Sequence, residues 1–114
     1  MLKGLGNLGD MARMMKAAQE MQGRMAEVQE DLGRITVEGS AGAGLVRATA
    51  TAKGDLTGLS IDPSIFREED REMVEDLILA AIRDAQGRAA ERMAEEMRRV
   101  AEDLGLPGGM MPGL

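Results

Sequence analysis

Apolar side chains recur every third or fourth residue in the N-terminal part of the chain, between about Asn7 and Leu32. On a helix, alternating spacings of three and four place them in one narrow stripe, the a and d positions of a heptad, which packs against a second helix. Gly33 follows the last apolar position and predicts the end of the helix. The apolar positions of this stripe are Met11, Met14, Ala18, Met21, Met25, Val28 and Leu32.

The apolar period shortens to two after Gly33, which is typical of strands. A β-branched run over 35–37 predicts a short first strand. The glycine-rich segment 39–44 predicts a tight turn, because glycine adopts the positive φ angles that such a turn needs. Small apolar and hydroxyl side chains alternate over 45–52 and 56–61 and predict two more strands joined by a short turn. The three strands are expected to form an antiparallel meander.

The buried face of this sheet is harder to assign, because its side chains are small. Successive side chains of a strand point to opposite faces, so a shift of one residue exchanges the two faces. We expect the buried face to carry Leu45, Leu59 and Ile61, or the residues that alternate with them.

A second long helix is predicted from Arg71 to about Leu104. The segment Asp62-Pro63-Ser64 ends the last strand, residues 64–66 suit a short helical turn, and the acidic cluster 68–70 suits a helix N-terminus. As far as Ala85 the apolar residues form a wide stripe that can cover a sheet, and beyond it the stripe narrows. We expect the second half of this helix to protrude and to pack on the Met-rich first helix.

One α+β domain over residues 1–104 accounts for this pattern, and the segment 105–114, rich in Gly, Pro and Met, is expected to be a flexible tail. The 114-residue chain contains 11 Met but a single aromatic residue, Phe66. A small chain that spends many apolar residues on helical stripes buries a low fraction of its surface. We therefore expect a second copy to complete the core in a homodimer.

The sequence lacks the usual groups for catalysis. It has no His and no Cys, which removes the commonest general base, the thiol nucleophile and nearly all zinc sites. The carboxylates between Glu68 and Asp76 suit a solvated helix start, and a hydrolase built on a carboxylate pair is a third hypothesis. The glycines at 39–44 lack the Gly-Lys-Ser/Thr ending of a phosphate loop. We expect no enzyme activity, no cofactor, no metal site and no small-molecule substrate.

Membrane insertion and export are not expected either. The sequence has no run of about 20 apolar residues that predicts a membrane span. Its first ten residues contain no apolar block that resembles a signal peptide. We therefore expect a cytoplasmic protein.

Net charge limits any contact with nucleic acid to a local patch. The chain carries 20 acidic and 14 basic residues, a formal charge of -6, which is the wrong sign for a surface that meets DNA everywhere. Arg88, Arg92 and Arg99 share one helix face, with Arg98 beside it. The residues alone favour a solvated face with ion pairs to nearby carboxylates. Those carboxylates are Glu91, Glu95, Glu96 and Glu102.

Three segments of the sequence resemble the YbaB/EbfC family. They are 37–46, with its Glu-Gly-Ser-Ala-Gly-Ala-Gly run, then Ile61-Asp62-Pro63-Ser64, then 72–85, with Glu72 to Ile78, Ala80-Ala81 and Asp84-Ala85. The Met- and Gln-rich first helix and the Gly/Pro/Met tail agree with the family, so the resemblance covers nearly the whole chain. It implies an intertwined homodimer of helix, sheet and long helix, whose helices project like tweezers and bind duplex DNA.

The resemblance also indicates which residues contact DNA. In the family this contact is attributed to basic residues on the projecting helices. Some relatives carry a basic pair near the second hairpin where this chain has Asp55-Leu56-Thr57-Gly58, which weakens the case for a contribution from the sheet. The matching positions are Arg13, Lys16 and Arg24 on the first helix and Arg88, Arg92, Arg98 and Arg99 on the last.

The expected function is that of a bacterial nucleoid-associated protein. It binds duplex DNA with little sequence specificity and alters its conformation, contributing to nucleoid organisation and gene regulation. Little base reading is expected, because one aromatic residue offers almost no means of stacking on bases. The alternative is a protein-interaction adaptor that docks through the Met-rich helix or the C-terminal tail, since methionine surfaces adapt to many partners.

Overall fold

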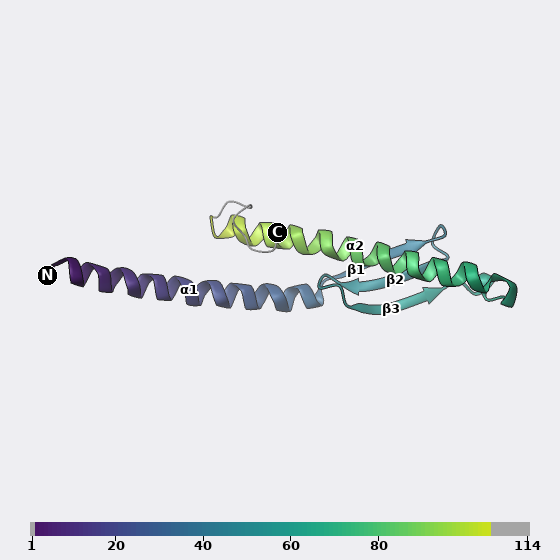
Figure 1. Ribbon diagram of the computed structural model, residues 1–114, viewed down its shortest axis with the longest axis horizontal. Coiled ribbons are helices and arrows are strands. Elements are labelled where there is room, and N and C mark those ends of the chain that lie inside the picture. Colours follow the sequence, from purple (N-terminus) through teal and green to yellow (C-terminus); the bar gives the residue numbers. More distant parts are fainter. Residues whose placement is uncertain (1, 106–114) are drawn as a thin grey trace.

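Two long helices and a three-stranded sheet make up the fold (Figure 1). The computed structural model describes the backbone of residues 2–105 and the side chains of residues 8–105. The molecule measures 83 × 21 × 18 Å along its principal axes. The expected α+β order is confirmed, and the expected tail lies outside the described residues apart from Gly105. The elements are α1 (Leu2–Arg34), β1 (Thr36–Ala41), β2 (Val46–Thr51), β3 (Leu56–Ile61), the 3-10 turns Pro63–Ile65 and Glu68–Asp70, and α2 (Arg71–Asp103).

The sheet is the predicted antiparallel meander, with the strands in the order β1-β2-β3. Its two faces differ in polarity. In register, Gly39 pairs with Ala48 and Ala48 with Leu59, so these three residues lie on one face, which is apolar. The residues that alternate with Gly39 along β1 and with Ala48 along β2 lie on the opposite, polar face. Glu38 and Arg47 are among them. Helix α2 covers the apolar face over β1 and β2.

Close packing of α2 on the sheet depends on small residues on both sides. Gly39 lies where the helix comes closest: a Cβ built there would sit 2.6 Å from Cα of Ala85 and 2.7 Å from the carbonyl oxygen of Ala81. Real side chains do not approach backbone so closely, so only glycine fits. The buried core at this contact consists of Val46, Ala48, Ala50, Ile65, Ala81, Ala85 and Ala89.

The glycine-rich segment is divided between a strand and a turn. The sequence places Gly39 in the turn, but β1 runs on to Ala41 and Gly39 serves the helix contact instead. Three consecutive residues make the turn with positive φ: Gly42 (63°), Ala43 (56°) and Gly44 (87°). The turn prediction is therefore right for the second half of the segment and wrong for its start.

The sequence left two alternating sets open for the buried face, and the structure decides between them. In β2 the fully buried residues are Val46, Ala48 and Ala50, which alternate with Leu45, while Leu45 and Ile61 are half-buried. Leu59 does lie on the apolar face, but it is 50% exposed because α2 does not reach over β3.

The C-terminal half of α2 leaves the sheet and packs on α1, as the sequence predicts. Val100 and Ala101 are buried there against Met25, Val28 and Leu104. Helix α1 ends one residue beyond Gly33 and begins before the predicted start. The two helices run antiparallel, and α1 continues well past the end of α2 (Figure 1).

One carboxylate joins the free edge of β1 to α2. Asp84 Oδ2 accepts a hydrogen bond from the Ser40 backbone N–H at 3.0 Å and another from Arg88 Nε at 3.2 Å. Both bonds favour the ionised form, and the Ser40 N–H lowers the pKa of Asp84 most, followed by Arg88. Asp84 thus takes up a backbone N–H of the edge strand β1 that would otherwise be free to pair with a strand of another chain.

Replacing Gly39 with Ala is expected to destabilise the protein by about 1–3 kcal/mol, because the new methyl group must push α2 off the sheet. Chemical denaturation followed by circular dichroism measures the loss. Gly87→Ala is the matched control, since a Cβ there meets nothing within 4 Å and α2 gains up to about 1 kcal/mol of helix propensity. Equal stability of the two variants would show that the contact at Gly39 is unimportant.

Replacing Asp84 with Asn is expected to lower the unfolding midpoint at neutral pH. A carboxyl group with a lowered pKa stabilises the fold above its unfolded-state pKa, and the contribution is lost as pH falls through the folded-state pKa. The difference between wild type and Asp84→Asn should therefore be constant from pH 7 to about 5 and shrink below about pH 4. A difference that grows on acidification would contradict this assignment.

Candidate nucleic-acid interface

The N-terminal half of α1 forms an arm that projects beyond the rest of the molecule (Figure 1). We define the arm as residues 8–22, and every one of these residues is exposed. It carries two basic residues, Arg13 and Lys16, and two acidic ones, Asp10 and Glu20. The arm is therefore neutral, in contrast to the acidic chain as a whole.

Arg13 and Lys16 are three residues apart and so lie on the same side of the arm. Among the described residues, neither makes an ion pair within 4.0 Å, and the same holds for Arg98 on α2. These three cations meet water on the described surface. They are the predicted site residues that a polyanion can approach most directly.

The other four predicted site residues are engaged by carboxylates. Arg24 of α1 bonds Asp103 of α2 at 2.9 Å, and Arg88 bonds Asp84 at 3.2 Å. Arg92 and Arg99 share Glu96, each at 3.1 Å, and Arg99 also reaches Glu95 at 3.2 Å. The ion-paired face that the residues alone favour is thus present for these arginines, with Glu95 and Glu96 as two of its expected partners.

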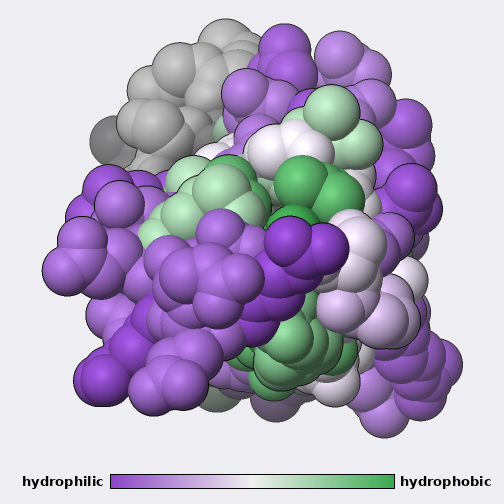
Figure 2. Space-filling view, turned by 90° about the vertical axis from the view of Figure 1, so that its right-hand side faces the viewer, coloured by the Kyte–Doolittle hydropathy of each residue, from purple (hydrophilic) through white to green (hydrophobic). Residues whose placement is uncertain are grey.

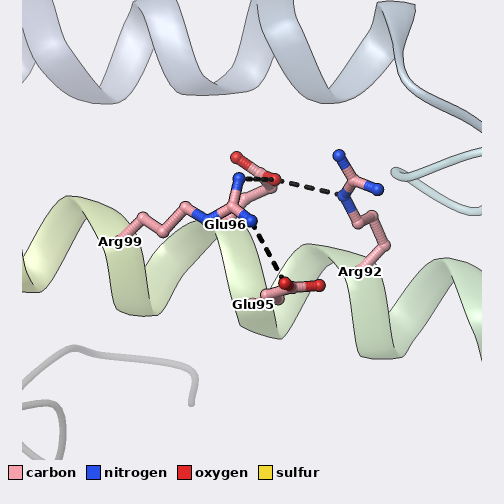
Figure 3. A network of polar contacts seen from close by, with 4 residues as sticks. All are labelled: Arg92, Glu95, Glu96 and Arg99. Atoms are coloured by element: carbon pink, nitrogen blue, oxygen red, sulfur yellow. Dashed lines mark hydrogen bonds and ion pairs between the residues drawn. The ribbon is translucent and has the colours of Figure 1, made fainter.

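Figure 3 shows this network on the side of α2 that faces α1. Glu96 is its least exposed member, with a side chain 20% exposed, and it accepts hydrogen bonds from the guanidinium groups on either side of it. A carboxylate between two guanidinium groups holds both side chains along the helix axis. The arrangement fixes Arg92 and Arg99 but also lowers the positive potential that they present.

Carboxylates outnumber arginines in both grooves that border α2. The groove beside β1 is lined by Arg88 and Arg92 together with Glu38, Glu91 and Glu95. The groove between the helices contains two arginines against four carboxylates. Its lining is Arg24, Arg99, Glu27, Asp31, Glu96 and Asp103, with Val28 and Val100. Neither groove is a positive channel, so the predicted residues do not form one continuous basic surface.

The opposite end of the molecule has a different character. Apolar surface is open at the centre of this end and is bordered by polar surface (Figure 2). A shallow cavity there is lined by the apolar residues Ile65, Phe66 and Val74 together with two arginines and two glutamates, Arg67, Arg71, Glu68 and Glu75. Phe66, the one aromatic residue, is 67% exposed. Within residues 8–105, no three carboxylates converge to hold a metal ion, and no described helix is long and apolar enough to cross a membrane.

Sequence reasoning missed two features of the structure, the contacts of Asp84 and the exposure of the arm's methionines. Asp84 lies beside Arg88 and the edge of β1, a contact between residues 44 positions apart in the chain. The exposure of the arm's methionines was also missed, because the heptad pattern of α1 does not show how far along α1 the packing of α2 extends. The spacing of Asp84 and Arg88, four residues apart, was the one available signal for their ion pair.

The sequence matches the model of the YbaB/EbfC DNA-binding family over residues 7–104. It is 45% identical over 101 residues to a nucleoid-associated protein of Afipia carboxidovorans, covering 89% of this chain and 96% of that protein. It is 43% identical over 103 residues to one of Bradyrhizobium diazoefficiens, covering 90% and 97%.

A solved structure has the same fold. The crystal structure of an uncharacterized protein from Helicobacter pylori superimposes with a TM-score of 0.61 at 20% identity, covering 80% of this chain and 91% of the other. The match to the family model spans the arm, the sheet and α2. This chain belongs to the YbaB/EbfC DNA-binding family.

Proposed function

We propose that this protein is a bacterial nucleoid-associated protein that binds duplex DNA with little sequence specificity and alters its conformation. Membership of a DNA-binding family and the similarity to nucleoid-associated proteins support this role. It would act in the cytoplasm, on the nucleoid, in chromosome organisation and gene regulation. The observation that carries the proposal is the arm, which holds Arg13 and Lys16 in solvent and away from the acidic grooves.

Contact with phosphates would begin at the free cations and then recruit the paired ones. Exposed ion pairs contribute only about 0–1 kcal/mol each, so a phosphate can replace a carboxylate as the partner of Arg88 or Arg99. Both side chains are more than half exposed. Arginine suits this exchange because its planar guanidinium group binds phosphate through two hydrogen bonds. Of the seven predicted residues, the unpaired Arg13, Lys16 and Arg98 would bind phosphate first. The four ion-paired arginines would follow by exchanging a carboxylate for a phosphate.

Binding of this kind is weak and sensitive to salt. Each phosphate neutralised releases counterions and lowers the logarithm of the binding constant by about 0.9 per tenfold rise in salt. Phosphate contacts position a protein on the duplex but carry no base sequence. We expect a dissociation constant of roughly micromolar, as for other non-specific binders.

A homodimer would supply two arms, and β3 is the surface that we assign to it. Leu56 and Leu59 are about half exposed on the apolar face of the sheet, beside α2 but not under it. β3 is also an edge strand with neither charge nor proline, which is the kind of edge that pairs with another chain. A second copy would cover both the edge and the leucines.

Reversing the charge of the arm is expected to remove DNA binding at moderate salt. In Arg13→Glu/Lys16→Glu each lost phosphate contact should lower the salt slope by about 0.9. Gel-shift titrations over a range of salt concentrations measure both affinity and slope. Circular dichroism should be unchanged, because neither side chain is packed.

Arg67→Glu/Arg71→Glu is the matched control for this experiment. It changes the net charge equally but at the end of the molecule opposite to the arm (Figure 1). We expect it to bind DNA nearly as well as wild type. An equal loss of DNA affinity in the two variants would mean that only the net charge of the protein matters, and this would contradict the proposed interface.

Replacing Leu59 with Glu is expected to give a monomer, because a charge would be buried in the paired surface. Light scattering measures the mass at low protein concentration, where weaker contacts are dissociated. Ser60→Glu is the control, since Ser60 lies on the polar face of the same strand opposite Arg47. A dimer that survives Leu59→Glu would place the interface elsewhere.

A further inference from the structure

The apolar stripe of α1 is covered over only half of its length. Met25 and Val28 pack against Val100 and Leu104 of α2. The same heptad stripe continues into the arm, where α2 has ended and nothing in the described part of the chain covers it. Met14, at its centre, is 72% exposed, and Met11 and Met21 are 59% and 40% exposed. Apolar stripes left open on a soluble protein usually mark an interaction surface.

The residues that flank the open stripe favour another apolar helix as its partner. On the heptad, the flanking e and g positions of the arm are Leu8, Met15, Ala17 and Gln22, with Asp10 as the single charge. A polyanion has nothing to bind on this side. The basic residues Arg13 and Lys16 occupy the outer c and f positions instead.

We propose that the arm pairs with the arm of a second copy in an antiparallel two-helix coiled coil. In antiparallel pairs an a position faces a d position, so a register centred on Lys16 sets Met11 opposite Met21 and Met14 opposite Ala18. All four open positions of one arm are then matched by the four of the other. The stripe on each copy is then covered along its whole length, one half by α2 and the other half by the arm of the second copy.

Charge and length both favour this register. It sets Asp10 of one copy opposite Arg24 of the other, at paired g positions, and brings no like charges together. Arg24 bonds Asp103 at 2.9 Å and still has further N–H groups to donate. The pairing also ends at Met21, where α2 of the same copy begins to cover the stripe. A parallel pair would lack the Asp10–Arg24 contact and would bring the two α2 helices to the same end.

The contact is short and is therefore expected to be weak by itself. Four turns of helix bury much less than the roughly 1,600 Å² of a standard protein interface, and isolated short helices are marginal in water. Two arms on one homodimer would raise the effective concentration for each pairing. If the proposed DNA binding holds, Arg13 and Lys16 stay free on the outer side of the pair, and arm pairing would link molecules bound to separate stretches of duplex.

Met14→Glu tests the pairing without disturbing the fold, because Met14 is exposed and unpacked in the single chain. Sedimentation velocity over a wide concentration range is expected to show concentration-dependent association in wild type and its loss in Met14→Glu. Gln19→Glu adds the same charge on the outer side of the arm and should associate like wild type. Association that is unchanged in Met14→Glu would overturn the proposal.

The test separates arm pairing from the dimer at β3. At high concentration Leu59→Glu should still form dimers through its arms, and the double variant Leu59→Glu/Met14→Glu should remain a monomer. Met14→Gln removes the apolar side chain without adding a charge beside Arg13, so in low salt it should keep the affinity of wild type for a short duplex that accepts one molecule. A failure of DNA binding is therefore seen independently of a failure of arm pairing.

The register is tested by cysteines, since the chain has none of its own. When Met14→Cys and Ala18→Cys proteins are mixed and oxidised, an antiparallel pair predicts the mixed disulfide as the main product. A parallel pair predicts disulfides of each variant with itself. The second outcome, or no disulfide at high protein concentration, would overturn the antiparallel pairing.

Discussion

The approach of α2 to the sheet is the contact on which the rest of the structure depends. Ala81 and Ala85 lie against Gly39 so closely that the helix backbone rests on the strand. Small side chains make this possible but bury little area, and a methylene group contributes only about 0.8 kcal/mol. The single domain therefore has a close-packed but thin core. It leaves Leu56 and Leu59 half exposed, which is why we propose β3 as the surface that a second copy covers.

The direction of α2 also determines where its far end meets α1. Once the helix is fixed on β1 and β2, its far half reaches α1 at Met25 and Val28 and ends there. Helix α1, equally long at 33 residues, continues in the opposite direction as a free arm. One packing contact at the sheet thus decides which half of the methionine stripe is core and which half is surface.

The paired and unpaired cations follow the same division between the packed part of the molecule and the arm. Along α2, Arg88, Arg92 and Arg99 are held by carboxylates three or four residues away, and Glu96 serves two of them. On the arm, Arg13 and Lys16 stand without such partners among the described residues. An acidic protein meets a polyanion most readily through cations that are not already paired with its own carboxylates. The arm provides two such cations, and its apolar stripe and its basic residues lie on different sides of the helix.

The sequence by itself determined the elements, their order and the meander, because heptad spacing, period-two alternation and turn residues act over a few neighbouring positions. The family followed from the resemblance of three segments, which also indicated the seven basic residues of the candidate interface. It did not determine which face of the sheet is buried, since the alternating residues are nearly equal in size, nor that Gly39 contacts Ala85 instead of turning the chain. Only the tertiary structure decided those points, together with the partners of Arg24 and Asp84. Each depends on where α2 crosses the sheet, and that crossing brings together residues far apart in the chain.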